Sequence, residues 1–227
     1  MGIAENLGLI RGNIERHATL AGRSPGDVIL VAVTKTHSPD EINEAISAGV
    51  TDIGENKVQE IIDKYDAVLP VNWHMIGHLQ RNKVKYIIDK VKMIHSVDSF
   101  RLAEEIDKKA EQAGIVMDIL IQVNIAEEDS KFGAQADETE TLISEIIGNC
   151  GHIRVRGLMC MAPYADDPED VRLYFKQAKD MFDKFGSIEH DNFDFKYLSM
   201  GMSGDFGVAV EEGSNMVRIG TAIFGNR

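Results

Sequence analysis

Short apolar runs alternate with amphipathic stretches along the chain, and this alternation predicts strands that are each followed by a helix. Residues 29–33 (ILVAV) and 119–123 (ILIQV) are nearly continuous aliphatic runs, as expected for parallel strands covered on both faces. Strands that alternate with helices at this spacing favour a parallel sheet. Eight strands are predicted, over 28–35, 51–54, 73–77, 93–97, 117–124, 153–161, 195–201 and 216–224.

The stretches between these strands carry helix start and stop signals. Ser38 begins one helix in a capping box with Glu41, and Gly49 ends it. Further helices are predicted over roughly 3–21, before the first strand, over 100–113, and from 167 onward.

Eight strands in 227 residues fit an α/β fold, a single-domain TIM-type (β/α)8 barrel over 1–227 with one extra N-terminal helix. A doubly wound open sheet is the alternative. Periodicity does not separate the two folds, because only a closed barrel pairs the eighth strand with the first.

The balance of charge narrows the range of partners. The chain has 24 Lys and Arg residues against 37 Asp and Glu residues, a formal net charge of −13, which opposes nonspecific attraction to nucleic acid or to an anionic membrane. No stretch approaches the ~20 apolar residues that span a bilayer. The N-terminus lacks a secretory signal, and Cys150 and Cys160 give no disulfide framework. We therefore expect a cytoplasmic protein without a nucleic-acid or membrane partner.

Lys35 ends the first predicted strand, where the working residues of a (β/α)8 barrel lie. A lysine that closes an apolar strand is desolvated, which favours the neutral amine that forms an imine with an aldehyde. The structural alternative is a lysine whose ammonium group simply reaches solvent from the strand end.

Small residues follow the last two predicted strands. Ser203 and Gly204 would place a hydroxyl and N–H groups at a helix N-terminus, where an anion is favoured, and Gly220 and Thr221 could add donors. Loops after strands seven and eight often bind phosphate on this fold, and closure places the eighth strand beside the first. A lysine beside a phosphate site predicts a phosphorylated aldehyde or ketone as ligand. Glycines that only make tight turns are the alternative.

Arg218 and Gly220 share one face of the eighth strand because side chains alternate. A guanidinium only donates hydrogen bonds and effectively never loses its proton. Against a pyridine nitrogen it would keep that nitrogen unprotonated, which makes the ring a poorer electron sink. A salt bridge to Glu211 or Glu212 is the alternative.

A histidine pair and an acidic loop give weaker evidence for a functional site. His74 and His78 have the spacing of a helical metal pair but span a strand and its loop, so no metal site is predicted. The acidic loop 127–133 follows the fifth strand, and we interpret it as a solvated rim, with a lid or docking loop as the alternative.

Six segments together resemble the YggS/PROSC family, the pyridoxal-phosphate-binding proteins of vitamin B6 homeostasis. The family itself is similar to the N-terminal barrel of alanine racemase. The resemblance covers almost the whole chain and runs through 31–35 (VAVTK), 54–60 (GENKVQE), 73–80 (WHMIGHLQ), 157–159 (GLM), 198–203 (LSMGMS) and 218–221 (RIGT).

The resemblance implies pyridoxal 5′-phosphate (PLP) as the cofactor, held on Lys35 as a Schiff base. It implies a protein of intracellular PLP homeostasis that supplies PLP to apo-forms of PLP-dependent enzymes. The other implied roles are the phosphate site for Ser203, Gly204, Gly220 and Thr221, the ring nitrogen for Arg218, and near neighbours of the cofactor for Asn56, His78 and Met200.

Two enzymatic functions stay open beside this one. One is a low-activity amino-acid racemase, which needs a second base. The racemases that share this barrel take that base from an additional domain. The sequence ends at Arg227, just after the last predicted strand, so we expect no such domain and a monomer. A Schiff-base aldolase acting on a sugar phosphate also suits a lysine beside a phosphate site.

Overall fold

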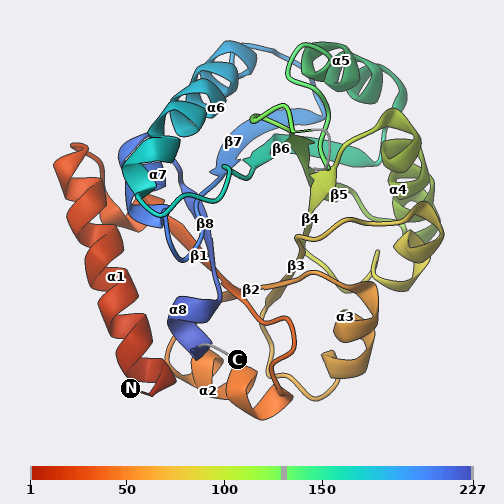
Figure 1. Ribbon diagram of the computed structural model, residues 1–227. Coiled ribbons are helices and arrows are strands. Elements are labelled where there is room, and N and C mark those ends of the chain that lie inside the picture. Colours follow the sequence, from red (N-terminus) through yellow and green to blue (C-terminus); the bar gives the residue numbers. More distant parts are fainter. Residues whose placement is uncertain (1, 129–131, 226–227) are drawn as a thin grey trace.

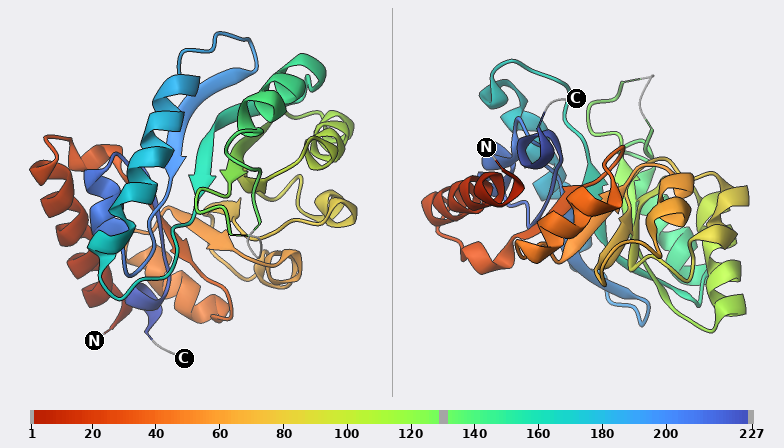
Figure 2. Two further views of the ribbon diagram at one scale, coloured as in Figure 1. Left: turned by 45° about the horizontal axis from the view of Figure 1, so that its top comes forward. Right: turned by 90° about the horizontal axis from the view of Figure 1, so that it is seen from below.

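The computed structural model describes residues 2–128 and 132–225. Eight parallel strands form a closed barrel in chain order, and the helices lie around its outside (Figures 1 and 2). The strands are β1 (Ile29–Val33), β2 (Asp52–Glu55), β3 (Asn72–Met75), β4 (Met93–Val97), β5 (Met117–Val123), β6 (Ile153–Cys160), β7 (Phe193–Ser199) and β8 (Met216–Ile219).

Closure of the barrel decides between the two predicted folds. β8 pairs with β1 through four parallel register pairs, from Ile29 with Met216 to Ala32 with Ile219. The closed (β/α)8 barrel is therefore confirmed, and the doubly wound open sheet is excluded.

The helices begin and end near the predicted start and stop signals. Ser38 and Glu41 form the capping box at the start of α2, and Gly114 ends α4 in a left-handed conformation. The helices are α1 (Ile3–Leu20), α2 (Pro39–Ser47), α3 (Val58–Lys64), α4 (Phe100–Ala113), α5 (Thr139–Asn149), α6 (Arg172–Phe185), α7 (Phe206–Glu211) and α8 (Thr221–Phe224), with 3₁₀ turns η1 (Pro25–Asp27), η2 (Arg81–Tyr86) and η3 (Pro168–Val171).

The eighth strand is shorter than predicted. It ends at Ile219, and the apolar residues that follow form the short helix α8. Gly220 has φ −119° and ψ −75°, which is not an extended conformation, so the chain turns out of the sheet at this residue.

The sheet separates two apolar clusters. Because side chains alternate along a strand, one set of side chains points inside the barrel and the other set packs against the helices. The inner cluster is small and consists of Val31, Met93, Leu120, Met159 and Met216. The outer one is extensive and includes the buried Cys160. No helix in the described part of the chain is long and apolar enough to cross a membrane.

Candidate functional site

A cavity of about 230 Å³ lies at the carboxyl ends of β1, β7 and β8. This is the end of the barrel where parallel strands present their loops, and where binding residues gather on this fold. Six of the nine predicted site residues line it, namely Lys35, Ser203, Gly204, Arg218, Gly220 and Thr221, together with Val33, His37, Met202 and Gly225.

Close packing of β8 against β1 brings the two halves of this cavity together. A Cβ at Gly220 would lie 3.2 Å from the Cβ of Val33 and 3.2 Å from its carbonyl oxygen. That distance is tighter than ordinary van der Waals contact, so a side chain at Gly220 would push the end of β8 away from the strand that precedes Lys35. Residues 185 positions apart in sequence therefore share one cavity.

The turn that carries Lys35 is held by a carboxylate. Thr36 has φ +67°, an uncommon conformation for a β-branched residue, and its N–H donates to Glu60 Oε2 at 2.6 Å. Burial on its own raises the pKa of Glu60, but hydrogen bonds from Lys64 and Thr36 outweigh it and lower that pKa. An ionised Glu60 therefore stabilises the strained residue beside Lys35.

A buried group of charges anchors Glu60 in turn. Lys64 Nζ donates to Glu60 Oε2 at 2.8 Å, to Glu55 Oε1 at 2.8 Å and to the Thr34 carbonyl at 3.0 Å. These bonds tie α3 to the end of β1, one residue before Lys35. Lys35 itself is exposed, so the predicted desolvation of this lysine is wrong; the strand ends two residues earlier, at Val33.

The predicted phosphate site combines a hydroxyl with backbone N–H groups. Ser203 Oγ accepts from the N–H groups of Gly220 and Ala222, both at 3.4 Å, which is long for a hydrogen bond. A Cβ at Gly204 would meet no atom within 4 Å, so this side of the cavity is open. Weakly engaged donors beside open space can bind an anion.

Arg218 is buried in the barrel, and its guanidinium reaches the cavity. Nη1 donates to the carbonyl and to the hydroxyl of Ser199, at 2.8 and 2.7 Å, and Nη2 donates to the Cys160 carbonyl at 2.9 Å. These bonds use three of the five N–H donors of a guanidinium. Burial lowers the pKa of Arg218, but a guanidinium stays charged in proteins.

The alternative role for Arg218 is excluded. Glu211 and Glu212, its suggested salt-bridge partners, both pair with Arg172, at 2.7 and 2.5 Å. These ion pairs of Arg172 lie on the outside of the barrel, where they join α6 to α7. Arg218 is therefore available to a ligand in the cavity.

Asn56, His78 and Met200 do not line this cavity. Met200 is fully buried, and His78 is exposed and stacked on Phe132 with 4.1 Å between ring centroids. Asn56 Oδ1 is buried and has no hydrogen-bond partner in the described part of the chain. A Cβ at Gly77 would lie 2.2 Å from the Asn56 carbonyl oxygen, so Gly77 lets the loops after β2 and β3 touch. These three residues stay predicted neighbours of the cofactor.

His37 lines the cavity and was not predicted. Its ring stacks on Phe224 with 4.3 Å between centroids, and its Nδ1 lies 3.2 Å from Glu41 Oε1. Its place directly before the Ser38 cap, two residues after Lys35, was the only sequence signal. It adds a third nitrogen-bearing side chain to a cavity that already has Lys35 and Arg218.

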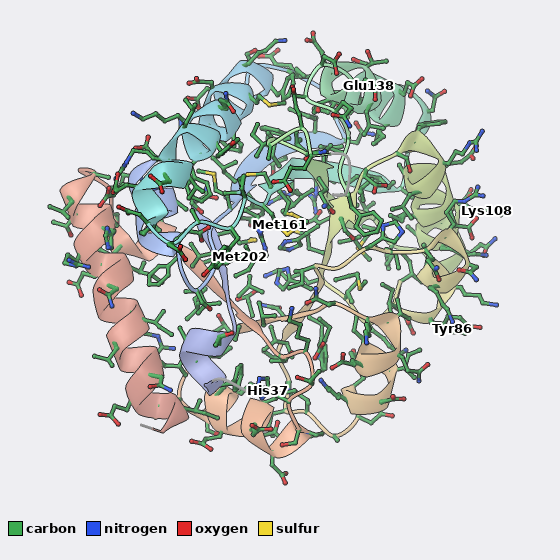
Figure 3. The ribbon with its side chains drawn as sticks, in the orientation of Figure 1. His37, Tyr86, Lys108, Glu138, Met161 and Met202 are labelled. Carbon is green, nitrogen blue, oxygen red and sulfur yellow. The ribbon has the colours of Figure 1, made fainter. Side chains whose placement is uncertain are left out.

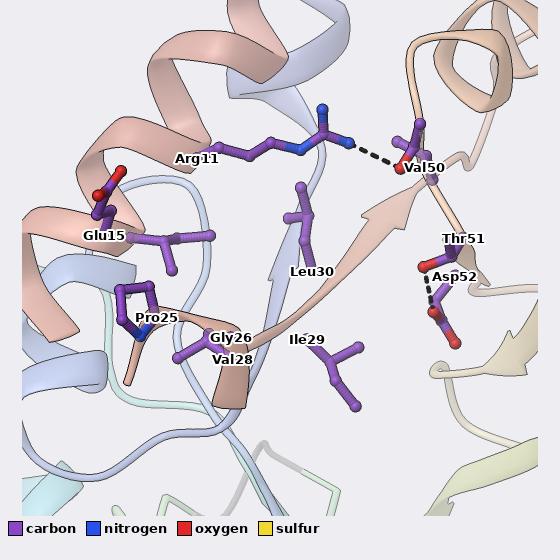
Figure 4. Close-up of a pocket in the computed structure, with 12 residues that line it drawn as sticks. Arg11, Glu15, Pro25, Gly26, Val28, Ile29, Leu30, Val50, Thr51 and Asp52 are labelled. Atoms are coloured by element: carbon purple, nitrogen blue, oxygen red, sulfur yellow. Dashed lines mark hydrogen bonds between the residues drawn. The ribbon is translucent and has the colours of Figure 1, made fainter. Parts of the chain in front are cut away.

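Two further cavities among the described residues do not contain this combination of groups. A cavity of about 440 Å³ lies at the opposite end of the barrel between α1, β1 and β2, where Arg11 donates to the Gly49 carbonyl and Thr51 donates to Asp52 (Figure 4). An apolar cavity of about 340 Å³ adjoins the candidate site, and Met161 and Met202 line it over the middle of the barrel (Figure 3). Tyr164, which also lines this cavity, is 92% exposed.

Two other polar features from the sequence are the histidine pair His74 and His78 and the acidic loop 127–133. Among the described residues, no group of three or more His, Cys, Asp or Glu side chains could hold a metal ion. His74, one of the two histidines considered for such a site, is buried inside the barrel. The acidic loop 127–133 includes residues 129–131, so the prediction for this loop falls partly outside the described residues.

Comparisons with known proteins agree with this fold. A family model described as the alanine racemase N-terminal domain matches residues 6–227. A pyridoxal phosphate homeostasis protein of Aquifex aeolicus is 41% identical over 100% of this chain and 99% of the relative. One of Escherichia coli K12 is 39% identical over 99% of this chain and 97% of the relative.

A solved structure extends the likeness to three dimensions. PipY of Synechococcus elongatus PCC7942, determined with PLP bound, is 33% identical, with a TM-score of 0.83 over 98% of this chain and 100% of PipY. The chain therefore belongs to the family of the pyridoxal phosphate homeostasis proteins, which has the barrel of the alanine racemase N-terminal domain.

Proposed function

We propose that this protein binds PLP in the cavity at the ends of β1, β7 and β8 and takes part in PLP homeostasis. Lys35 would hold the aldehyde carbon as an imine, and Arg218 would face the ring nitrogen. The phosphate would lie against Ser203, Gly204, Gly220 and Thr221. The observation that carries the proposal is one small cavity containing a lysine, an arginine and a set of anion-binding donors.

The chemistry of the donors fits a phosphorylated aldehyde. A phosphate accepts hydrogen bonds, and the cavity offers the hydroxyls of Ser203 and Thr221 and the N–H groups of Gly220 and Ala222. The carboxylate of Asp205 lies next to this group, but it accepts from the Met202 N–H at 2.5 Å, and burial raises its pKa. Repulsion of an anionic phosphate by this carboxylate is thereby reduced.

The character of Arg218 supports storage of PLP over amino-acid chemistry. Bound PLP supplies a pyridine ring that withdraws electrons best when its nitrogen is protonated. Arg218 has only donors and keeps its own proton, so it stabilises the unprotonated nitrogen. We infer a site that holds the cofactor and activates it weakly.

We further propose that the protein passes PLP to apo-forms of PLP-dependent enzymes in the cytoplasm, and that it acts as a monomer. Lys35 is exposed at the open end of the barrel, so an attacking amine can reach an imine formed there. This accessibility supports release to an acceptor.

The attachment is tested by loading the purified protein with PLP, reducing it with borohydride and mapping the labelled peptide by mass spectrometry. We expect the label on Lys35, and loss of the yellow absorbance in Lys35→Ala. Lys57→Ala, an exposed lysine at the start of α3 that does not line the cavity, is the matched control and should stay yellow. Label on another lysine, or label fixed by borohydride in Lys35→Ala, would overturn the assignment.

Transfer is tested by mixing the loaded protein with an apo-enzyme in the presence of a phosphatase that destroys free PLP. Faster activation than from the same amount of free PLP supports direct delivery. Equal rates from both sources would reduce the role of the protein to buffering.

A further inference from the structure

Five polar side chains form a continuous line through the interior of the barrel. Arg218 Nη1 donates to Ser199 Oγ at 2.7 Å, and Ser199 Oγ lies 3.4 Å from His95 Nδ1. His95 Nε2 lies 2.8 Å from His74 Nδ1, and His74 Nε2 lies 2.9 Å from Asp52 Oδ1. All five residues are buried, and they come from β8, β7, β4, β3 and β2. The line leads from the candidate PLP cavity to the opposite end of the barrel.

Asp52 supplies a negative charge at the far end of this line. Burial on its own raises the pKa of Asp52, but hydrogen bonds from His74 and Thr51 outweigh it and lower that pKa to about 2. Lys92 Nζ lies 3.6 Å from Asp52 Oδ1 and favours the same ionised form. An ionised carboxylate only accepts hydrogen bonds. His74 Nε2 must therefore carry a proton and donate it to Asp52.

The two histidines are neutral. Burial lowers the pKa of His74 despite the opposing effect of Asp52, and burial, His74 and Arg218 lower the pKa of His95 well below its usual range. A neutral imidazole has one donor nitrogen and one acceptor nitrogen. Because His74 donates from Nε2, its Nδ1 accepts, so His95 donates from Nε2 and its own Nδ1 accepts from Ser199.

The same direction follows from the other end of the line. A guanidinium has no acceptor, so Ser199 Oγ must accept from Arg218. Its hydroxyl proton is then available to His95 Nδ1, which lies 3.4 Å away. Assignments that start from a fixed cation and from a fixed anion agree at every link, so each proton has a single place.

We propose that Asp52, His74, His95 and Ser199 are positioning residues that hold Arg218 through a hydrogen-bond chain of one direction. The proposal deepens the proposed function, because Arg218 is the group assigned to the PLP ring nitrogen. The chain fixes which way the guanidinium points, and it joins this buried cation to a carboxylate at the other end of the barrel. Removing an interior link would leave Arg218 with its carbonyl contacts to Ser199 and Cys160 but without this orientation.

The first test needs no PLP. Nitrogen-15 NMR of histidine-labelled protein reads which ring nitrogen carries the proton, because protonated and bare imidazole nitrogens differ widely in chemical shift. We expect both His74 and His95 to be neutral rings with the proton on Nε2 at neutral pH. A proton on Nδ1 of either ring, or a doubly protonated ring at neutral pH, would overturn the chain.

Three variants test whether the chain acts on Arg218. His95→Leu removes the hydrogen bonds of the central residue and replaces the imidazole with an apolar side chain of similar size. His95→Gln retains an N–H that can donate to His74. Leu120→Ala disturbs the inner apolar cluster without touching a polar link and is the matched control. Each folded protein is compared for its His74 spectrum, PLP affinity and nitrogen-15 shift of bound, labelled PLP.

We expect His95→Leu to weaken PLP binding about tenfold, the equivalent of one ordinary hydrogen bond between neutral groups. The shift of the PLP ring nitrogen should move toward the protonated value, since a loosened Arg218 no longer opposes protonation. His95→Gln should restore the His74 spectrum and part of the affinity, and Leu120→Ala should change neither the His74 spectrum nor the ring-nitrogen shift. If His95→Leu and Leu120→Ala shift the ring nitrogen equally, the residue has only a packing role.

The outcomes separate this proposal from the proposed function. If wild-type protein fails to bind PLP while the two rings show the expected protons, the PLP assignment fails and the chain stands. If PLP binds on Lys35 and either ring carries its proton on Nδ1, the chain fails and the PLP assignment stands.

Discussion

The carboxylate of Asp52 lies where burial alone would favour its neutral form, and its neighbours keep it ionised. Two hydrogen bonds, from His74 Nε2 and Thr51 Oγ1, favour the charged form more strongly than desolvation opposes it. A carboxyl whose pKa is lower in the folded than in the unfolded chain stabilises the fold at pH values above its unfolded pKa. Asp52 should therefore contribute to the stability of this protein at neutral pH, and this contribution should be lost at acid pH.

We expect Asp52→Asn to lower the free energy of unfolding by about 2 kcal/mol at neutral pH, from the difference between a pKa of 3.8 unfolded and about 2 folded. The wild-type advantage should be fully present above about pH 4 and vanish as the pH falls toward about 2. Urea denaturation of both proteins across this interval measures it. Asp63→Asn, an exposed position on α3, serves as control, and a pH-independent difference for Asp52→Asn would contradict this account.

At the scale of single residues, the sequence predicted which side chains gather but not how they are held. Lys35, Arg218 and the small residues after β7 and β8 were found because strand ends meet in a barrel. The buried pairing of Lys64 with Glu55 and Glu60 was missed, since charged residues on a helix are usually exposed. His74 and His95 bind each other across two strands, and their further partners lie on two other strands, contacts that no local pattern reveals.

At the scale of elements, β6 depends on one glycine. Gly157 has φ +149°, and the register between β6 and β7 shifts between Val155 and Gly157. A Cβ at this position would lie 1.8 Å from the Tyr197 carbonyl oxygen. Backbone cannot move out of the way cheaply, so both the conformation and the close approach require glycine.

Gly157→Ala should lower the free energy of unfolding by at least about 3 kcal/mol, or prevent folding, because the added methyl group separates β6 from β7. Gly148→Ala is the matched control: Gly148 is exposed in α5, and a Cβ there meets nothing within 4 Å. It should raise stability by about 0.5–1 kcal/mol through helix propensity. Thermal melting distinguishes the two, and similar midpoints for both variants would refute the requirement at Gly157.

Elements with strong punctuation were predicted most closely. The helix over 100–113 has the predicted bounds, because a clear apolar stripe ends at Gly114. The eighth strand was overextended, since the apolar residues at 222–224 are equally typical of a strand and of a short buried helix. α8 packs against α1, where Asn6 Nδ2 donates to the Ile223 carbonyl at 2.8 Å.

At the scale of the whole molecule, α1 covers the region where β8 returns to β1. It packs against α2, α7 and α8 and lies along one side of the barrel (Figure 1). Just after α1, Arg23 Nη1 donates to the carbonyls of Val210 and Ser214, at 2.7 and 2.8 Å. The extra helix thus joins the first and last parts of the chain across the closure of the barrel.

Arg23→Leu should destabilise the protein by about 2 kcal/mol, because two part-buried carbonyls lose their donor. Hydrogen exchange should quicken at the amides of α7 and β8 while those of β4 and β5 keep their protection. Arg16→Ala, an exposed arginine on α1, is the control. Uniform loss of protection across all strands would mean that Arg23 supports the barrel as a whole and not its closure.

The cavity that contains Lys35 and Arg218 belongs to a molecule with a formal net charge of −13. Far from the surface, a doubly charged phosphate ester meets the net negative field, and only within about 10 Å, the screening length at 0.1 M salt, do the local cations dominate. Added salt weakens the long-range repulsion first, so arrival at the cavity speeds up with ionic strength while departure also becomes easier. We therefore expect the protein to exchange such a ligand faster at high than at low ionic strength, the reverse of a binder whose net charge attracts its ligand.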